Sequence, residues 1–289
     1  MTPREAIDAL RKVQGLRFRD VRPLHGGWAH WTFEVDGEWI FRFPRNPAVA
    51  AQTVKELSLL PLLAGKVGCS VPMPVWRGTH RDRPFFGYRK ILGRPLDAQD
   101  IGERPELTEE LAQALRQLHF FPAEDARQAT SAKGTVESWR EKYERLRATA
   151  RDRVGPMLDA WASQVMDERF AEFVANLHFA PALVHGDLGP EHLLVDNTGR
   201  LAGIIDWEDA SVGDPAIDFA GLWRSAGAQV TRRILAAYQT TDDAPMEERV
   251  TSYAWIANVH DALHGLDVGD ADLVARSIAL LQGALQGTW

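Results

Sequence analysis

The sequence has little of several residue types and patterns, and each shortage excludes a class of protein. Cys69 is the one cysteine among 289 residues, so no disulfide can form within the chain and a reducing compartment is expected. No uninterrupted apolar run is long enough to span a membrane, and the opening segment MTPREAIDALRK lacks the apolar core of a signal peptide. We therefore expect a cytoplasmic protein with no membrane partner.

Basic residues are also in the minority. Lys and Arg number 33 against 40 Asp and Glu, which gives a formal net charge of −7, and no basic face stands out. Nucleic-acid binding depends on basic surfaces, so this balance disfavours a nucleic-acid partner and suits a neutral or cationic small ligand. What the chain does have is 45% hydrophobic and 25% charged residues, typical of a globular protein, and a length that predicts about two lobes.

Strand patterns dominate the first third of the chain. TFEV and EWIFRF flank Asp36-Gly37, a dipeptide typical of two-residue hairpins, and alternation along EWIFRF separates an aromatic face from Arg42. Two further strands are expected around MPVWRG and FFGYRKI. A helix over 48–64 precedes them, and its periodic apolar positions are Val54, Leu57, Leu60 and Leu63.

After a connector rich in glycine, proline and charge, residues 93–105, the pattern becomes helical. Three short strands, LVH, HLLVD and LAGIID, interrupt the helices, and Asn197-Thr198-Gly199 joins the last two as a hairpin. We therefore expect an N-terminal lobe over 1–92 and a larger helical lobe over 106–289 that contains the hairpin. Helix periodicity covers four segments: 109–119, 135–153, 162–178 and 246–286, the last with room for two or three helices.

The segment LVHGDLGPEHLLVD, from Leu183 to Asp196, contains several side chains that can take part in catalysis or bind a metal. Asp187 follows an apolar strand and precedes a Gly-Pro turn, His192 opens the next strand, and Asp206 ends the strand after it. A hairpin of this length returns Asp206 to the neighbourhood of His192 and Asp187. Two carboxylates and an imidazole in one cleft would suit a divalent metal and a general base, whereas the alternative interpretation is that both aspartates only cap turns.

The motifs HGDLGPEHLLVD and GIIDWEDASVGDPAIDFA resemble those of the antibiotic and small-molecule kinases built around the aminoglycoside phosphotransferases. That family shows HxDxxxxN, an apolar strand ending in Asp, and then GDPxxDLA, and the order of the lobes agrees over nearly the whole chain. The stretch from GGWAHWTFEVDGEWIFRFPRN to FFGYRKILGRPL looks most like the aminoglycoside 2″-phosphotransferases; macrolide kinases are also similar and share the His at position 192. The resemblance implies an α+β, bilobal, protein-kinase-like fold.

The resemblance also implies roles for the residues of these motifs. Asp187 is expected to be the catalytic carboxylate that takes or orients the proton of the attacking hydroxyl. Asp206 would hold Mg²⁺, and His192 stands where the family usually has an Asn metal ligand. Three residues are expected to support this loop structurally, His185 by hydrogen bonds, Asp214 as a helix N-cap and Asp218 as a brace.

In the N-terminal lobe, the resemblance places a phosphate-binding residue at Arg42, where the family expects Lys, with Glu56 as its partner. Lys55 and Arg45 remain nearby alternatives for the cation. Gly26 and Gly27 form either a nucleotide loop or an ordinary tight turn. Backbone groups of Arg89 and Ile91 are expected to contact the adenine or guanine of ATP or GTP, and the sequence leaves the choice of nucleotide open.

The residues that would contact the acceptor are the least defined. The family's 2″ enzymes tend to be acidic after the position of Asp218, whereas this chain has FAGLWRSAGAQVTRR. Trp255 and His260 lie on one predicted helix with His264, and Trp255 is expected in the core. The candidate acceptor contacts are Glu191, Trp223, Asp261 and His264.

The predicted function is therefore a kinase that transfers a γ-phosphoryl group to a hydroxyl of a small antibiotic-like molecule. Aminoglycosides are the first acceptor class, macrolides and other natural products the second, and metabolites the third. The changes at Arg42 and His192 also leave open a nucleotide-binding regulator with little or no turnover. Small molecules are the only expected partners of this monomer or homodimer.

Overall fold

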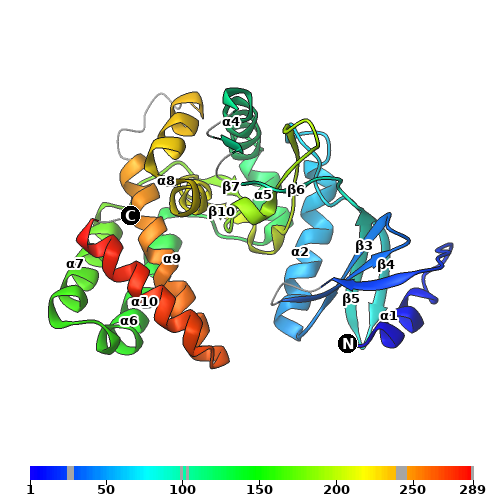
Figure 1. Cartoon of the computed structure of the whole chain (residues 1–289), viewed down its shortest axis with the longest axis horizontal. Helices are drawn as coiled ribbons and strands as arrows, with labels where there is room; N and C mark the ends of the chain where they lie inside the picture. Colours follow the sequence, from blue (N-terminus) through cyan, green and yellow to red (C-terminus); the bar gives the residue numbers. More distant parts are fainter. Residues whose placement is uncertain (25–28, 98–99, 102–103, 239–245, 288–289) are drawn as a thin grey trace.

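The computed structural model describes residues 1–24, 29–97, 100–101, 104–238 and 246–287. Its N-terminal part is built on a β-sheet and its C-terminal part is mostly helical, and the two lie side by side in Figure 1. This is the α+β, two-lobed arrangement that the sequence predicts. Within the described ranges, none of the helices combines the length and apolar character needed to cross a membrane.

The N-terminal lobe contains a five-stranded antiparallel sheet with the order β1-β2-β3-β5-β4. The predicted hairpin is present, with three connecting residues instead of the expected two: β2 and β3 pair from His30↔Pro44 to Val35↔Trp39, and Glu38 follows Asp36 and Gly37, which have φ of 53° and 68°. Positive φ at both positions is the geometry that a tight hairpin turn requires. The strands are β1 (Val21–Leu24), β2 (His30–Val35), β3 (Trp39–Pro44), β4 (Pro74–His80) and β5 (Arg83–Arg89).

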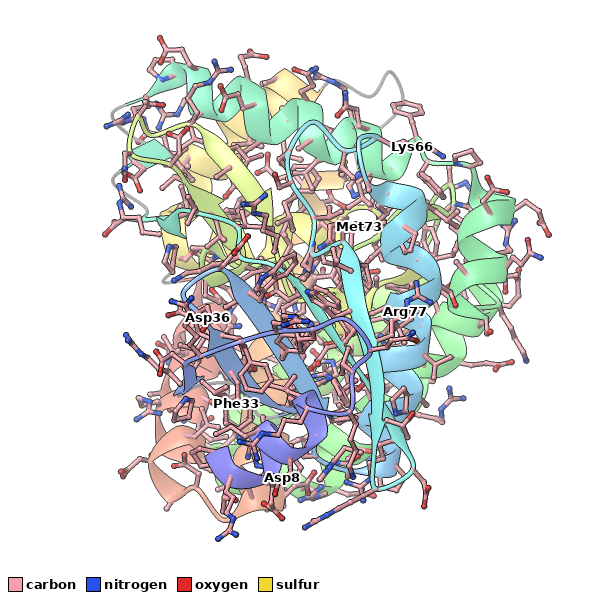
Figure 2. The ribbon with its side chains drawn as sticks, turned by 90° about the vertical axis from the view of Figure 1, so that its right-hand side faces the viewer. Asp8, Phe33, Asp36, Lys66, Met73 and Arg77 are labelled. Atoms are coloured by element: carbon pink, nitrogen blue, oxygen red, sulfur yellow. The ribbon has the colours of Figure 1, made fainter. Side chains whose placement is uncertain are left out.

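A different helix packs on each face of this sheet. Helix α1 (Pro3–Leu10) packs on one face, where Phe33, Phe41 and Phe43 form a small aromatic core with Leu10. Figure 2 shows α1, marked by Asp8, lying over the strand that carries Phe33. Helix α2 (Pro47–Leu63) packs on the other face, toward which Arg42 points. The predicted alternation along β3 is therefore confirmed.

The predicted helix over 48–64 is present as α2, and Leu60 and Leu63 are buried as expected, but Val54 is not. Val54 is 52% exposed, whereas Thr53 and Glu56 are fully buried. Two polar residues share the buried side with the leucines, because Thr53 contacts His30 and Glu56 contacts Arg42. A count of apolar positions could not reveal this preference.

The segment predicted as a connector contains β6 (Arg94–Pro95), which pairs with β8 (Leu193–Val195), the first strand of the hairpin predicted around residues 197–199. The other strand of that hairpin is β9 (Leu201–Ile204), and the three strands form one small sheet. A separate two-stranded sheet pairs β7 (Ala182–Val184) with β10 (Ser211–Gly213). These short strands hold the turns on either side of them at the bottom of the space between the lobes.

Helices surround these strands in the C-terminal lobe, and their inward sides contribute most of one continuous apolar core. The predicted helices are confirmed in the first three segments, and 246–286 contains two. The helices of this lobe are α4 (Pro105–His119), α5 (Ala123–Thr130), α6 (Val136–Arg153), α7 (Ala160–Asn176), α8 (Ile217–Tyr238), α9 (Met246–Val268) and α10 (Ala271–Gln286).

Apolar periodicity predicts neither α5 nor the extent of α8, although the expected N-cap at Asp214 marks the start of α8. Helix α5 is short and buries only Ala126, so it has almost no apolar periodicity. Helix α8 is interrupted at Gly227, which has a φ of 82°, and this interruption breaks its periodic pattern. In both cases, tertiary packing supplies stability that local periodicity does not signal.

Candidate active site

A large cleft of about 1540 Å³ lies between the two lobes. From the N-terminal lobe it is lined by His30, Ile40, Arg42 and Tyr88, and from the C-terminal lobe by the loop that carries Asp187 and His192. We use the term C-terminal half of the cleft for the part lined by Lys133, Lys142, Arg145, Arg224, His260 and Asp261. Clefts between two domains or lobes are a usual position of small-molecule sites.

The structure brings Asp187, His192 and Asp206 together at the bottom of the cleft. His192 Nδ1 donates a hydrogen bond to the Asp187 carbonyl oxygen (2.7 Å) and lies 4.0 Å from the Asp187 carboxylate. On the other side of the ring, His192 Nε2 is 3.6 Å from Asp206 Oδ2. The β8–β9 hairpin makes this possible, because His192 immediately precedes β8 and Asp206 follows β9.

Asp187 and Asp206 experience different surroundings. Desolvation by the walls of the cleft raises the pKa of Asp187 to about 6, although its side chain is still 65% exposed; nearby His192 opposes this rise, and the Asp209 carboxylate adds to it. Burial also acts on Asp206, but the Arg42 guanidinium and then His192 outweigh it and hold the pKa of Asp206 below its ordinary value. Asp206 also has a φ of 66°, a left-handed conformation that non-glycine residues adopt at a cost.

These donors fit a divalent cation that is shared with a phosphate ligand. When the hydrogen bond to the Asp187 carbonyl holds the proton of a neutral His192 on Nδ1, Nε2 keeps a lone pair facing Asp206. Across the described ranges, no three His, Cys, Asp or Glu side chains gather closely enough to hold a metal by themselves. Mg²⁺ is commonly bound by one or two carboxylates plus substrate phosphates, and Asp206 meets that requirement, although imidazole is a less favourable Mg²⁺ ligand than oxygen.

Arg42 is the centre of a buried ionic network above this site. Its Nη1 donates to Glu56 Oε1 (2.6 Å), and its Nη2 donates to Asp206 Oδ1 (2.5 Å) and Glu208 Oε2 (3.0 Å). Glu56 is completely buried, and burial raises its pKa while the adjacent Arg42 opposes that rise. The guanidinium thus links α2, β3 and the turn after β9, so both lobes contribute to one electrostatic unit.

His30 provides a further contact for the same guanidinium. Its Nδ1 lies 3.0 Å from Arg42 Nη2 and its Nε2 lies 3.1 Å from Thr53 Oγ1, which itself donates to the Val49 carbonyl. His30 Nδ1 also lies 3.0 Å from Glu208 Oε2, so this ring nitrogen lies between the guanidinium and a carboxylate, and the tautomer decides which of them it bonds. Burial lowers the pKa of His30, which favours the neutral form.

The two other basic residues considered for the role of Arg42 are placed differently. Arg45 donates to the His30 carbonyl and stacks over the Trp31 ring. Lys55 lies on α2 beside Glu56, where its strongest electrostatic attraction is to Asp209. Neither borders the cleft, whereas Arg42 does.

Asp218 holds the loop that carries Asp187. Its carboxylate is fully buried and accepts from the backbone N–H groups of His185 and Gly186, both at 2.8 Å. His119 Nε2 is 3.0 Å from the same carboxylate. His185 in turn places its Nε2 2.9 Å from the Ile205 carbonyl, directly before Asp206. These bonds fix the two carboxylate-bearing turns relative to each other.

Asp214 has a structural environment. Its Oδ1 accepts from the Ala216 N–H, in the manner of a cap, and its Oδ2 accepts from Arg249 Nε (2.8 Å) and the Tyr253 hydroxyl (3.0 Å). Asp214 is fully buried, and burial raises its pKa while Arg249 opposes that rise. The contact ties the turn before α8 to helix α9.

This buried pair leads to a stability prediction. Arg249→Met should lower the free energy of unfolding by about 3 kcal/mol, because the Asp214 charge would stay buried without its cation. Equilibrium urea denaturation followed by circular dichroism measures the difference. Arg153→Met is the control, since Arg153 forms an exposed ion pair with Asp267, and we expect it to cost no more than about 1 kcal/mol. Equal losses in the two variants would show that Asp214 does not depend on Arg249.

The residues expected beside a nucleotide base are only partly placed at the cleft. Ile91 borders it, together with Tyr88 and Lys90. Arg89, by contrast, points away from the cleft, with a side chain 75% exposed and 3.1 Å from Glu38. The alternation of β5 turns this side chain outward, and the expected contact of the Arg89 backbone with the base stays a prediction. Gly26 and Gly27 lie outside the described residues.

Only some of the four residues expected to contact the acceptor lie at the cleft. Glu191, Asp261 and His264 border the cleft. Trp223 is only 4% exposed and belongs to the apolar core of the C-terminal lobe, so its expected contact is wrong. Trp255 is in the core, as expected, and packs against Phe170. Asp261 does not offer a free charge, because Arg224 Nη2 donates to it at 2.6 Å.

Sequence reasoning missed His30, Glu208 and Lys142. The period of two along β2 was a usable signal for His30, since Thr32, two residues later, pairs directly with Arg42. Glu208 lies two residues after Asp206, so the sequence also offered a signal for its position near Arg42. The sequence contains no signal for the position of Lys142. This residue lies on α6, a helix with a mostly polar surface, and only tertiary packing brings α6 to the cleft.

Comparison with known proteins identifies relatives of this chain. Residues 20–253 match the model of the phosphotransferase enzyme family. Viomycin phosphotransferase from Streptomyces vinaceus is 26% identical over 267 residues, which is 89% of this chain and 91% of that protein.

Solved structures show the same similarity. The GDP complex of wild-type aminoglycoside 2′-phosphotransferase-IIIa superimposes with a TM-score of 0.90 and 29% identity over 99% of each chain. The GDP and kanamycin complex of APH(2″)-IIIa gives a TM-score of 0.87 and 30% identity over 95% of this chain and 96% of that chain. A macrolide 2′-phosphotransferase type I shares the fold, with a TM-score of 0.74 at 22% identity.

Proposed function

Because the chain belongs to the phosphotransferase enzyme family, we propose that it transfers the γ-phosphoryl group of ATP or GTP to a hydroxyl of a small antibiotic-like molecule. One observation carries this proposal: Asp187, His192 and Asp206 converge in the cleft directly beneath the buried Arg42–Glu56 pair. Phosphoryl transfer depends mainly on positioning and on neutralising the charge of the phosphates, and this arrangement supplies groups for both.

Asp187 faces the open cleft, with a side chain 65% exposed, so a hydroxyl can approach it from solvent. In the proposed reaction it orients the acceptor hydroxyl and takes its proton while the hydroxyl oxygen forms a bond to the γ-phosphorus. The bond between that phosphorus and the β-phosphate oxygen breaks, which leaves a nucleoside diphosphate and a phosphate monoester. Asp218, through the backbone of His185 and Gly186, keeps the Asp187 loop in place.

Asp206 and His192 would hold Mg²⁺. When bound, this ion neutralises charge on the β- and γ-phosphates. The chain's own contribution is to fix the Asp206 carboxylate through β9 and to direct the His192 ring by its bond to the Asp187 carbonyl.

Arg42 would contact the phosphates farther from the acceptor. In the structure two of its three carboxylate partners, Asp206 and Glu208, are also in the cleft, so phosphate oxygens would compete with them for Nη2. Glu56, buried beneath, keeps the guanidinium in place through Nη1 during that exchange.

Variants of Arg42 test this assignment. Arg42→Ala should raise the KM for the nucleotide about tenfold or more with a smaller effect on the KM for the acceptor, because it removes a charge-assisted contact to phosphate. Steady-state kinetics with varied nucleotide measure this. Arg45→Ala is the matched control, since Arg45 lies outside the cleft and contacts Trp31. Unchanged kinetics in Arg42→Ala would show that another basic residue contacts the phosphates.

The acceptor class rests on the relatives. The kanamycin complex makes aminoglycosides the first compounds to test, followed by viomycin-type peptides and macrolides. The experiment measures transfer of labelled γ-phosphate from ATP and from GTP to each compound. Transfer that requires both the acceptor and Mg²⁺ would establish the activity, and the susceptibility of a host expressing the chain would show whether it confers resistance.

A nucleotide-binding regulator is the second candidate, because Arg42 and His192 replace residues that the family usually has. The same assay separates the two functions. Nucleotide binding without transfer to any acceptor would favour the regulator and contradict the kinase.

A further inference from the structure

The C-terminal half of the cleft has a charge distribution that differs from what a polycationic acceptor needs. Four basic side chains line it, and they are Lys133, Lys142, Arg145 and Arg224. Among the acids that border this region, Asp261 is bound by Arg224 and Asp209 attracts Lys142, whereas Asp187 and Glu191 lie on the loop at the reaction centre. A cationic acceptor would therefore bring its amines toward ammonium and guanidinium groups.

Lys142 is the most informative of these residues. Its Nζ lies 5.0 Å from the centre of the Trp139 ring and 5.4 Å from that of Tyr143, so aromatic faces hold the ammonium. Among the residues that the structure describes, the one carboxylate that attracts it is Asp209, and no carboxylate oxygen lies within 4.0 Å. Lys142 thus presents N–H donors to the cleft that no described anion occupies.

The placement of Lys142 and Lys133 beside the reaction centre follows from close packing. Trp139 lies against Gly213 of β10, where an added Cβ would come within 1.7 Å of its ring, and its Nε1 donates to the Val212 carbonyl. Gly134, next to Lys133, packs against Val212 in the same way and has a φ of 63°. The start of α6 is therefore fixed on β10, the strand that follows Asp209.

We propose that the acceptor carries an anionic oxygen group, a carboxylate or a phosphate or sulfate ester, which Lys142 and Lys133 bind while its hydroxyl faces Asp187. This inference rests on the proposed kinase function and names the chemistry of its acceptor. It accounts for the loss of acidic character after Asp218, for the pairing of Asp261 with Arg224, and for two lysines that point into the cleft without a described ion pair.

Three trisaccharides of similar size but different charge test the proposal. They are trigalacturonate, which is anionic, triacetylchitotriose, which is neutral, and the chitosan trisaccharide, which is cationic. Isothermal titration of the full chain, with Mg²⁺ and a non-hydrolysable nucleotide in slightly acidic buffer, should show trigalacturonate binding about tenfold tighter than the chitosan trisaccharide. Added salt should reduce this preference.

Variants then locate the effect. Lys142→Gln should weaken trigalacturonate binding about tenfold and leave triacetylchitotriose unchanged, and Lys133→Gln should do the same to a smaller extent. Lys12→Gln, on the exposed surface after α1, is the matched control and should change nothing.

Equal affinities for the charged trisaccharides, failure of both to bind, or preference for the cationic one would overturn the proposal. Weakened nucleotide binding in Lys142→Gln would also overturn it, because the lysine would then belong to the triphosphate site. Efficient phosphorylation of kanamycin, unaffected or improved by Lys142→Gln, would reject the anionic acceptor and leave the kinase function intact.

Discussion

Asp187→Asn should lower kcat for phosphoryl transfer by about 10² to 10⁴-fold, the range expected when a general base is removed. Asn has nearly the same shape, so the loop and the nucleotide site should be unaffected, but a neutral amide cannot take the proton of the acceptor hydroxyl. The dissociation constant of the nucleotide should therefore stay within about twofold of the wild-type value, a change well below that of a lost charged contact. Single-turnover transfer and nucleotide titration measure the two quantities separately.

A neighbouring acid provides the control for this prediction. Glu191→Gln changes an exposed carboxylate that also borders the cleft and belongs to the same loop, but it lies outside the hydrogen bonds that fix that loop. We expect a much smaller change in kcat for this variant. A wild-type rate in Asp187→Asn would exclude the role assigned to Asp187, whatever the effect of Glu191→Gln.

Asp206→Ala should lower kcat/KM by about 10³-fold or more, because the stabilisation of phosphate charge by a bound metal contributes several kcal/mol. Unlike Asp187→Asn, this variant should also lose the Mg²⁺ dependence of nucleotide binding. Titration of the nucleotide with and without Mg²⁺ is the direct measurement.

The folded structure of this second variant must be checked, since Asp206 also contacts Arg42. Glu208→Ala removes another carboxylate from the same guanidinium and serves as the comparison. If Asp206→Ala kept a Mg²⁺-dependent affinity equal to that of Glu208→Ala, the metal would be held elsewhere.

The sequence predicts the framework of the site well, because its motifs are local. Asp36-Gly37 identifies the β2–β3 hairpin, and the short strands around Asn197-Thr198-Gly199 place Asp206 near His192. In these segments, turn chemistry and strand alternation determine the geometry over a few residues.

The remaining features depend on contacts between distant segments. Glu56 faces inward because a buried guanidinium on another element needs it, and Val54 consequently faces solvent. Trp223 is in the core because of how α8 packs, and Lys142 reaches the cleft because Trp139 fits against Gly213. None of these outcomes follows from the period of the helix concerned, which is why the acceptor side of the site was the least predictable.

The most direct test is a crystal structure of the chain with a non-hydrolysable nucleoside triphosphate and with Mn²⁺ in place of Mg²⁺. Anomalous scattering then locates the metal. We expect a metal peak about 2.0–2.4 Å from an Asp206 oxygen and next to the phosphates, with Asp187 on the open side of the γ-phosphate. A nucleotide bound away from this cleft, or a metal that contacts neither Asp206 nor His192, would contradict this expectation.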